Sequence, residues 1–359
     1  MSNKFQRPYR LNWPDMPMPT ARMACIAYGL LIIYASLSPF NFNFGVGAEL
    51  LDWMIAPIPK YITSFDIFTN ILGYIPLGFL LVFAVYPLLK DYKALLFSLA
   101  LGLTLSASME SLQTWLATRI PSNVDWWANV LGCGIGALLA LPLGPRWLSG
   151  TAFEHKRHEW FGRRSSTVLL LFSFPFAQIY PQSAWLAMGD WGSIFTNEAI
   201  WSAPINYMGL EMATTAFAWL AAALTLGLGM RDRAPKIFII TNLLIATMIL
   251  KALFNGLQFG IDRAFVWLTP AAFWGMIFSG ILLIWLFELS KRWLYVMAIM
   301  AFLVMLLLVN FFPQNPYYLV SLQEWQQGRL IHFNHLMSWL SWLWPIGAGL
   351  SLLKGLKTR

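Results

Sequence analysis

Long apolar stretches separated by short polar segments fill most of this chain. Runs such as LLFSLALGLTL and AIMAFLVMLLLV belong to windows of about 18–25 apolar residues, and a helix of that length crosses a hydrocarbon layer of about 30 Å. The alternating pattern of a strand-built barrel is not seen. We therefore predict an all-α, polytopic transmembrane helical bundle of about ten spans. The expected spans are residues 22–39, 66–87, 93–117, 124–142, 167–188, 206–229, 235–257, 265–288, 293–312 and 333–353.

These spans divide the chain into four segments. Residues 1–21 form a polar N-terminal segment, and residues 22–142 hold the first four spans. Residues 143–166 form a basic loop, and residues 167–359 form an extension of about six helices.

The ends of three spans indicate an internal repeat. The first, fifth and ninth spans each end in an aromatic segment with a proline, at Pro39, Pro175 and Pro313. This spacing predicts units of four, four and two spans. Prolines and aromatic residues are also frequent wherever helices leave a bilayer, so a bundle without a repeat remains an alternative.

Composition and charge narrow the class of protein. Of 359 residues, 58% are hydrophobic and 11% charged, and the mean hydropathy is +0.60, which excludes an ordinary soluble domain. Most Lys and Arg residues fall in alternate loops, which predicts cytoplasmic N and C termini and a multi-pass protein of the bacterial inner membrane. The net charge of +8 is spread over separate inner segments. This distribution suits anionic membrane lipids and not nucleic acid as partners.

Polar residues recur at helical spacing near the predicted outer ends of three spans. Pairs lie four, three and four residues apart on the second, third and fourth spans, so each pair shares one helix face. If the three faces meet, they line an outward-facing pocket. A further polar face on the seventh span includes a lysine. These candidate ligand-binding residues are Asp66, Asn70, Glu110, Gln113, Arg119, Asp125, Asn129 and Lys251.

Glu110 is the most informative of these residues. A carboxylate inside a bilayer costs at least about 2.5 kcal/mol, so something must compensate for its burial. Protonation, hydrogen bonds from Gln113 and Asn129, or an ion pair with Arg119 would do so. Alternatively, the whole group joins helices through a satisfied polar network.

Lys251 has two interpretations. Its side chain either reaches the outer headgroups along the helix surface, or it lines a site for an anionic ligand, paired with Asp262 or Glu110. A short segment, ELLDWMIAPIP at 49–59, predicts an interfacial helix that either anchors the chain or covers a pocket.

No metal or cofactor is expected. The pairs His155/His158 and His332/His335 have metal-ligand spacing, but no Cys or carboxylate completes either set. The sequence contains no G-x-S-x-G, H-E-x-x-H or P-loop signature. Glu110 is the one candidate for a catalytic residue.

The first four spans carry a set of motifs found together in one family. SFDIFTNILGYIPLGF and SMESLQTWLATRIPSNVDWWANVLGCGIG resemble the VanZ-like membrane proteins. The likeness covers about residues 22–142 and implies a long form with a C-terminal extension. It further implies a role in glycopeptide resistance or cell-envelope assembly. The matching residues are Pro39, Phe40, Asp66, Asn70, Pro76, Leu77, Gly78, Glu110, Gln113, Arg119, Asp125, Asn129 and Gly132.

Three functions are compatible with these residues. The polar pocket would bind an envelope amphiphile, such as a lipid-linked saccharide, a phospholipid or a lipoglycopeptide. A membrane-embedded enzyme would use Glu110 as acid or base on a lipid headgroup. A non-catalytic scaffold would use the same residues only to join helices. The sequence does not indicate the oligomeric state.

Overall fold

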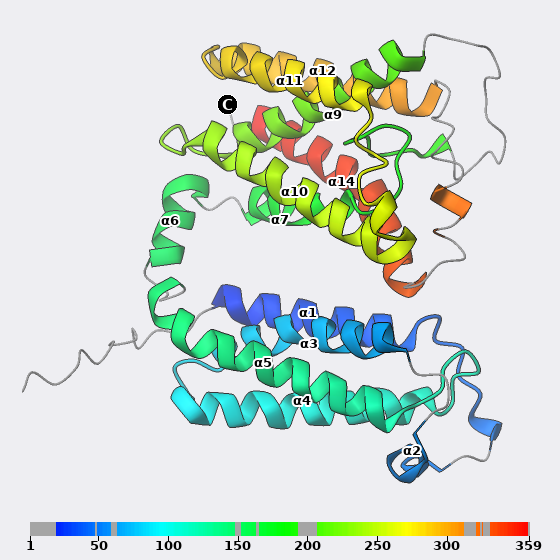
Figure 1. Cartoon of the computed structure of the whole chain (residues 1–359). Coiled ribbons are helices and arrows are strands. Elements are labelled where there is room, and N and C mark those ends of the chain that lie inside the picture. Colours follow the sequence, from blue (N-terminus) through cyan, green and yellow to red (C-terminus); the bar gives the residue numbers. More distant parts are fainter. Residues whose placement is uncertain are drawn as a thin grey trace, which may run out of the picture. The chain divides into compact units, whose positions relative to one another are not determined.

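The computed structural model describes a helical protein in two compact units (Figure 1). Unit 1 comprises Met1–Lys156 and unit 2 comprises Arg157–Arg359. Outside the helices, the described residues form loops and one isolated bridge between Phe42 and Leu116. The described residues are 19–46, 49–58, 63–147, 152–162, 165–192, 207–311, 321–323, 325 and 331–357.

The described residues of unit 1 before α6 form four long helices and two short ones. The long helices are α1 (Pro19–Leu37), α3 (Ser64–Ala84), α4 (Asp91–Gln113) and α5 (Asn123–Trp147). The short helices are η1 (Phe44–Val46) and α2 (Asp52–Ile55). α3 packs against α1, α4 and α5, and therefore lies at the centre of the unit.

Local sequence explains where two of these helices begin. The Thr63 hydroxyl accepts from the Asp66 main-chain N–H, and the Asp66 carboxylate accepts from the Thr63 N–H, which forms a capping box at the start of α3. The Ser122 hydroxyl accepts from the main-chain N–H groups of Val124 and Asp125 at the start of α5.

Glycines bring α3 and α5 into main-chain contact. A Cβ atom on Gly132 would overlap the Ile71 carbonyl of α3, and one on Gly136 would overlap the Ile75 carbonyl. Gly78 of α3 faces the Cys133 carbonyl of α5 in the same way. Small residues at this spacing are typical of close helix pairs in membranes.

Unit 2 is built around α9 (Tyr207–Gly229), most of which is buried. α9 packs against α11 (Pro270–Leu286) and α12 (Lys291–Phe311). α7 (Ser165–Ala177) packs against α10 (Lys236–Phe259) and α14 (Ile331–Lys357). The short η2 (Ile261–Arg263) follows α10. α6 (Ala152–Phe161) lies within the segment that was expected to be a loop and contains the boundary between the units.

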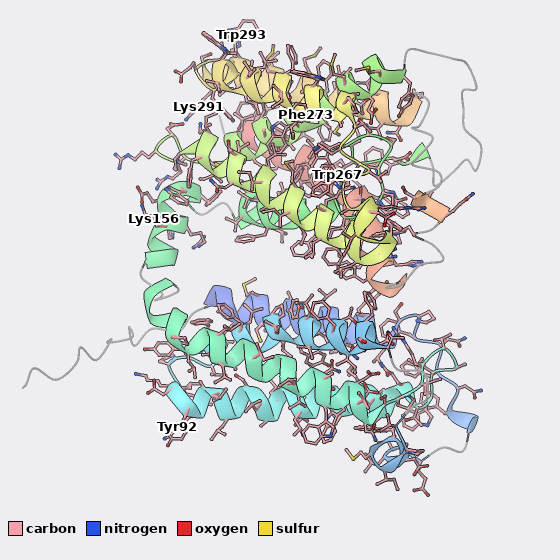
Figure 2. All side chains as sticks on the ribbon, viewed as in Figure 1. Tyr92, Lys156, Trp267, Phe273, Lys291 and Trp293 are labelled. Carbon is pink, nitrogen blue, oxygen red and sulfur yellow. The ribbon has the colours of Figure 1, made fainter. Side chains whose placement is uncertain are left out.

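Within the described parts of the chain, seven helices are long and apolar enough to cross a membrane. They match the second, third, fourth, sixth, seventh, ninth and tenth expected spans. The first, fifth and eighth expected spans are shorter apolar helices, at Ala21–Leu37, Ser166–Ala177 and Pro270–Leu286. Large apolar and aromatic side chains, including Tyr92, Phe273 and Trp293, lie on the outer surface (Figure 2).

The fifth expected span, 167–188, is wrong in its second half. α7 ends at Ala177, and residues 178–190 continue as an irregular segment that is buried throughout. The residues of this segment are apolar enough to resemble a helix by hydropathy. Side chains from neighbouring helices donate hydrogen bonds to its main-chain carbonyls. The Tyr207 hydroxyl, for example, donates to the Ser183 carbonyl at 3.2 Å.

Candidate functional site

Seven of the eight predicted ligand-binding residues lie at one end of unit 1. This end contains the start of α3, the end of α4, the start of α5 and the linker 114–122. We call these seven residues the unit 1 polar site. They are Asp66, Asn70, Glu110, Gln113, Arg119, Asp125 and Asn129.

Glu110 lies in the last turn of α4 with only 3% of its surface exposed. Its Oε2 accepts a hydrogen bond of 2.8 Å from the main-chain N–H of Ser122. Because Ser122 caps α5, the carboxyl group lies at the positive end of that helix. A main-chain donor and a helix N-terminus therefore compensate for the burial of Glu110.

Gln113 and Arg119 bond to the end of α1. Gln113 Nε2 donates to the Ser36 carbonyl at 3.1 Å, and Arg119 Nη2 donates to the Ala35 carbonyl at 2.8 Å. The last carbonyls of a helix have no partner within it, so both side chains cap α1. Asn43 N–H also donates to the Trp115 carbonyl at 2.7 Å and fixes the exit from α1 against the linker.

Arg119 is half-buried, and its electrostatic surroundings are mixed. Burial lowers the pKa of its guanidinium group, and the nearby carboxyl groups of Glu110 and Asp125 oppose that shift. A guanidinium group keeps its charge in proteins. The site therefore contains one permanent cation beside acidic side chains.

Asp66, Asn70 and Asp125 lie at the junction of α3 and α5. Asp66 is exposed and accepts from the Thr63 hydroxyl at 2.7 Å within the capping box. The Asn70 amide lies within hydrogen-bonding reach of the Asp125 carboxyl group, which also interacts with the charge of Asp66. Asp66 therefore has a structural role at the helix start as well as a place beside the site.

Asn129 is buried deeper in the unit. Its Nδ2 donates to the Ser106 hydroxyl of α4 at 3.0 Å. The side-chain nitrogens of Asn129 and Gln113 thus bond to groups other than Glu110, contrary to the hydrogen bonds expected from the sequence.

Three buried polar atoms of the site have no hydrogen-bond partner among the described residues. They are Arg119 Nε, Asp125 Oδ1 and Asn129 Oδ1. Buried polar atoms are nearly always paired with protein, water or a ligand. The protein network of the site is therefore incomplete at these atoms.

α2 covers part of this end of unit 1. Trp53 is buried, its indole N–H donates to the Ser111 hydroxyl at 3.2 Å, and its ring meets Trp126 edge-on at 5.7 Å. Asn123 Nδ2 donates to the Ala56 carbonyl at 2.8 Å, which ties the segment after α2 to the start of α5. The described part of this segment, residues 49–58, thus packs onto the same helix ends as the polar site.

Sequence reasoning missed the contributions of α1 and Ser122. Both act through main-chain groups, and a main-chain N–H or carbonyl has no residue-type signature. The Ser122 cap had a weak signal, because Ser after Pro121 and before a helical run is a common helix start.

Lys251 is the eighth predicted residue and lies in unit 2. It is 3% exposed, so its side chain does not reach the surface. Its Nζ donates to the carbonyls of Gln178 and Tyr180 and to Gln182 Oε1. The expected pairing with Asp262 or Glu110 is replaced by these three neutral oxygens.

Two small cavities are found in the described part of unit 2. One, of ≈ 20 Å³, is lined by Lys251, Asn255 and Trp185. The other, of ≈ 10 Å³, is lined by Glu211, Tyr207 and Thr214. Among the described residues, no group of three or more His, Cys, Asp or Glu residues is placed to hold a metal ion.

Comparison with known proteins agrees with the motifs of the first four spans. Residues 16–144 match the VanZ/LLP1 family. No curated protein and no solved structure matches the chain significantly. The matched range contains every residue of the unit 1 polar site. The chain is thus a multi-pass membrane protein whose residues 16–144 form a VanZ/LLP1 family domain, followed by a further helical region.

Proposed function

We propose that the unit 1 polar site binds the headgroup of an amphiphile of the bacterial cell envelope. The observation that carries this proposal is the set of buried polar atoms without a protein partner, namely Arg119 Nε, Asp125 Oδ1 and Asn129 Oδ1. A headgroup with both donor and acceptor atoms would complete their hydrogen bonding.

The charge of the site favours an anionic headgroup. Arg119 presents a planar guanidinium group with Nη2 already fixed on Ala35 and Nε available. A guanidinium group held in this way suits phosphate or carboxylate oxygens. Glu110 and Asp125 would orient the cation and bond to hydroxyl groups of the same ligand.

The surroundings of the site favour a ligand with an apolar chain. Ile120 of the linker is 82% exposed, and Trp127 and Leu131 of α5 are also exposed. These side chains would lie against lipid beside the polar atoms. A lipid-linked saccharide, a phospholipid or a lipoglycopeptide offers both chemistries in one molecule.

We further propose that the site faces the outer leaflet of the bacterial cytoplasmic membrane. The distribution of Lys and Arg residues supports this orientation, with both termini in the cytoplasm. A site in the outer leaflet suits the role in cell-envelope assembly or glycopeptide resistance that the resemblance to VanZ-like proteins implies.

Native mass spectrometry of the purified protein tests the proposal with three probes: phosphatidylglycerol, a polyprenyl-phosphate-linked saccharide and teicoplanin. Arg119→Met should weaken binding of at least one probe by about tenfold, which corresponds to about 1.4 kcal/mol, and Arg119→Lys should lose less because it keeps the charge. Lys93→Met is the matched control, because Lys93 is exposed near the opposite end of α4.

Glu110→Gln separates the alternatives. Weaker binding in this variant supports a binding or transport role. Unchanged binding with loss of headgroup turnover would instead identify an enzyme with Glu110 as acid or base. Binding of no probe, or binding that none of the variants changes, would contradict the proposal and leave the scaffold function.

A further inference from the structure

Lys251 is a buried cation with all of its donors in use. Its Nζ lies 2.7 Å from the Gln178 carbonyl oxygen, 3.1 Å from the Tyr180 carbonyl oxygen and 3.1 Å from Gln182 Oε1. The Trp185 ring centroid is 5.6 Å from the same nitrogen. An ammonium group has three protons and no lone pair, so its protonated form fits these acceptors completely. We call Lys251 Nζ and these three oxygens the Lys251 cage.

The cage lies where α7 breaks off. Gln178 follows the last residue of α7, so its carbonyl is one of those left without a partner at a helix end. The negative end of the helix dipole points in the same direction. Irregular main chain at membrane depth is tolerated where protein or a water-filled cavity serves it. Lys251 donates hydrogen bonds to two carbonyls of this irregular segment, those of Gln178 and Tyr180.

The oxygens of the cage are of the kind that binds a monovalent cation. Carbonyls of an unwound segment and of a half-helix end hold cations inside membrane transporters. No carboxylate is paired with Lys251 among the residues that the structure describes. The ammonium group of Lys251 therefore occupies a site made of neutral oxygens and a helix end.

Loss of the Lys251 proton would disrupt this arrangement. A neutral amine has two protons and one lone pair, so one of the three acceptor oxygens would face a lone pair. A buried carbonyl without a hydrogen bond costs free energy. The segment 178–182 would therefore lose one of the three hydrogen bonds that fix it to α10.

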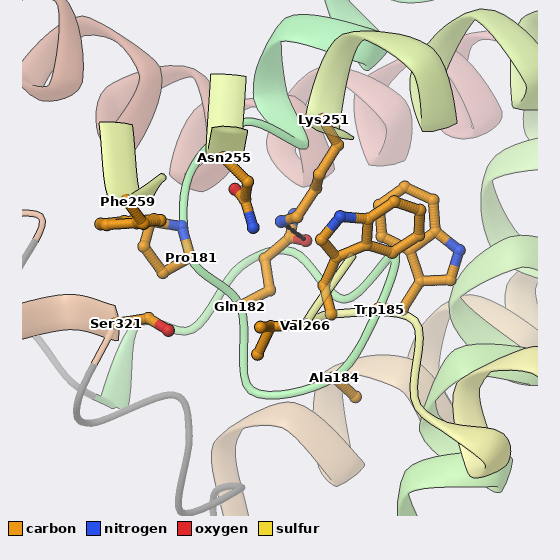
Figure 3. A pocket seen from close by; sticks show the side chains of 10 residues that line it. Pro181, Gln182, Ala184, Trp185, Lys251, Asn255, Phe259, Val266 and Ser321 are labelled. Atoms are coloured by element: carbon orange, nitrogen blue, oxygen red, sulfur yellow. Dashed lines mark hydrogen bonds between the residues drawn. The ribbon is translucent and has the colours of Figure 1, made fainter. Parts of the chain in front are cut away.

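A small cavity adjoins Lys251. The cavity of ≈ 20 Å³ is lined by polar and aromatic side chains, among them Lys251, Gln182, Asn255, Trp185 and Ser321 (Figure 3). A space of this size holds a water molecule when polar groups surround it. Water at this place would accept the proton and hydrate the freed carbonyls.

We propose that the Lys251 cage is a proton-binding site of unit 2, at which the bound proton locks the segment 178–192 in place and its release frees that segment. The ligand is the proton, and the site is independent of the amphiphile site of unit 1. Other ionisable side chains lie on the elements packed around α10, and their titration must be separated from that of Lys251. They are Tyr180, Asp190, Tyr207, Glu211, Asp262, Arg263 and His335.

Hydrogen exchange of the full chain in detergent tests this site. Peptides covering residues 178–192 are followed by mass spectrometry between about pH 5 and pH 10, with correction for the intrinsic exchange rate and with α9 peptides as an internal reference. In the wild type, corrected exchange of 178–192 should rise at least about tenfold as pH increases. Lys251→Met removes the charge and all donors, so this variant should exchange rapidly at every pH.

Lys291→Met is the matched control. Lys291 is an exposed lysine of α12 that bonds to Asp232 at 2.6 Å, so its loss should leave the pH profile of 178–192 unchanged. A flat wild-type profile, or a pH dependence that Lys251→Met retains, overturns the proposal. If Lys251→Met does not fold, the wild-type protein alone still tests the proposal. A flat pH profile of 178–192, measured against the α9 peptides, would exclude a segment whose opening depends on a bound proton.

Discussion

The buried carboxyl group of Glu110 is stabilised by a hydrogen bond from one main-chain N–H group. Its described partner is the Ser122 N–H at the start of α5. Glutamine has the same shape and an oxygen that can accept that bond, whereas alanine leaves the Ser122 donor unpaired in a buried position. Comparing the two variants therefore separates the contribution of the Ser122 hydrogen bond from the contribution of the charge of Glu110.

We predict that Glu110→Ala destabilises the protein by about 1–3 kcal/mol, the cost of a buried unpaired donor. Glu110→Gln should cost clearly less. Thermal unfolding in detergent measures both variants. Equal melting temperatures for the alanine and glutamine variants would show that the Ser122 bond does not stabilise the fold.

Sequence reasoning identified which side chains of unit 1 are polar and which helix faces they share. It did not identify what they bond to. Gln113 and Arg119 cap the carbonyls of Ser36 and Ala35, and these acceptors belong to a helix 77 and 84 residues away. Periodicity describes one helix at a time, so contacts between helices are outside its reach.

The pairing of α3 with α5 depends on two glycines that continue the stripe formed by Asp125 and Asn129 along one face of α5. Gly132 and Gly136 follow Asp125 and Asn129 on α5, and they allow the main chains to touch. The stripe therefore has two functions along its length. Its first half carries polar side chains, and its second half provides close contact.

We predict that Gly132→Ala destabilises unit 1 by about 1–3 kcal/mol, because the new methyl group overlaps the Ile71 carbonyl and must displace a helix. Gly73→Ala is the matched control on α3, because no atom lies within 4 Å of its added Cβ. Thermal unfolding should separate the two. A control variant that melts as early as Gly132→Ala would contradict the packing argument.

Helix positions were largely predictable, and the end of α7 was not. Each of the other expected spans overlaps a helix in the described residues. Residues 178–188 include Ile179, Trp185 and Leu186, which are as apolar as a spanning helix. Pro181 disfavours a continued helix, and it is the one part of this break that the sequence displays. The bonds that Lys251 and Tyr207 donate to carbonyls of the irregular segment leave no mark in local hydropathy.

In both units, a polar side chain from one helix caps the carbonyl end of another helix. In unit 1, Gln113 of α4 caps the end of α1, and in unit 2, Lys251 of α10 caps the end of α7. Gly275 of α11 also approaches the Met212 carbonyl of α9, as Gly132 of α5 approaches α3. These likenesses agree with the repeat of four, four and two spans, which stays a prediction.

Unit 1 should fold without unit 2. Every described partner of the unit 1 polar site lies within residues 1–156. We predict that a fragment of these residues unfolds cooperatively in detergent and that Gly132→Ala destabilises it as in the full chain. A fragment that lacks a cooperative transition would show that unit 2 is needed for its fold.

The broken helix has a consequence for how the protein is made. α7 contains 13 residues, which is about 20 Å of helix against a hydrocarbon layer of about 30 Å. Lys251 follows Gln182 by 69 residues, so the ribosome delivers the capping ammonium group long after the carbonyls that need it. Until α10 has been synthesised, the carbonyls of Gln178 and Tyr180 therefore lack the donor that they have in the folded protein.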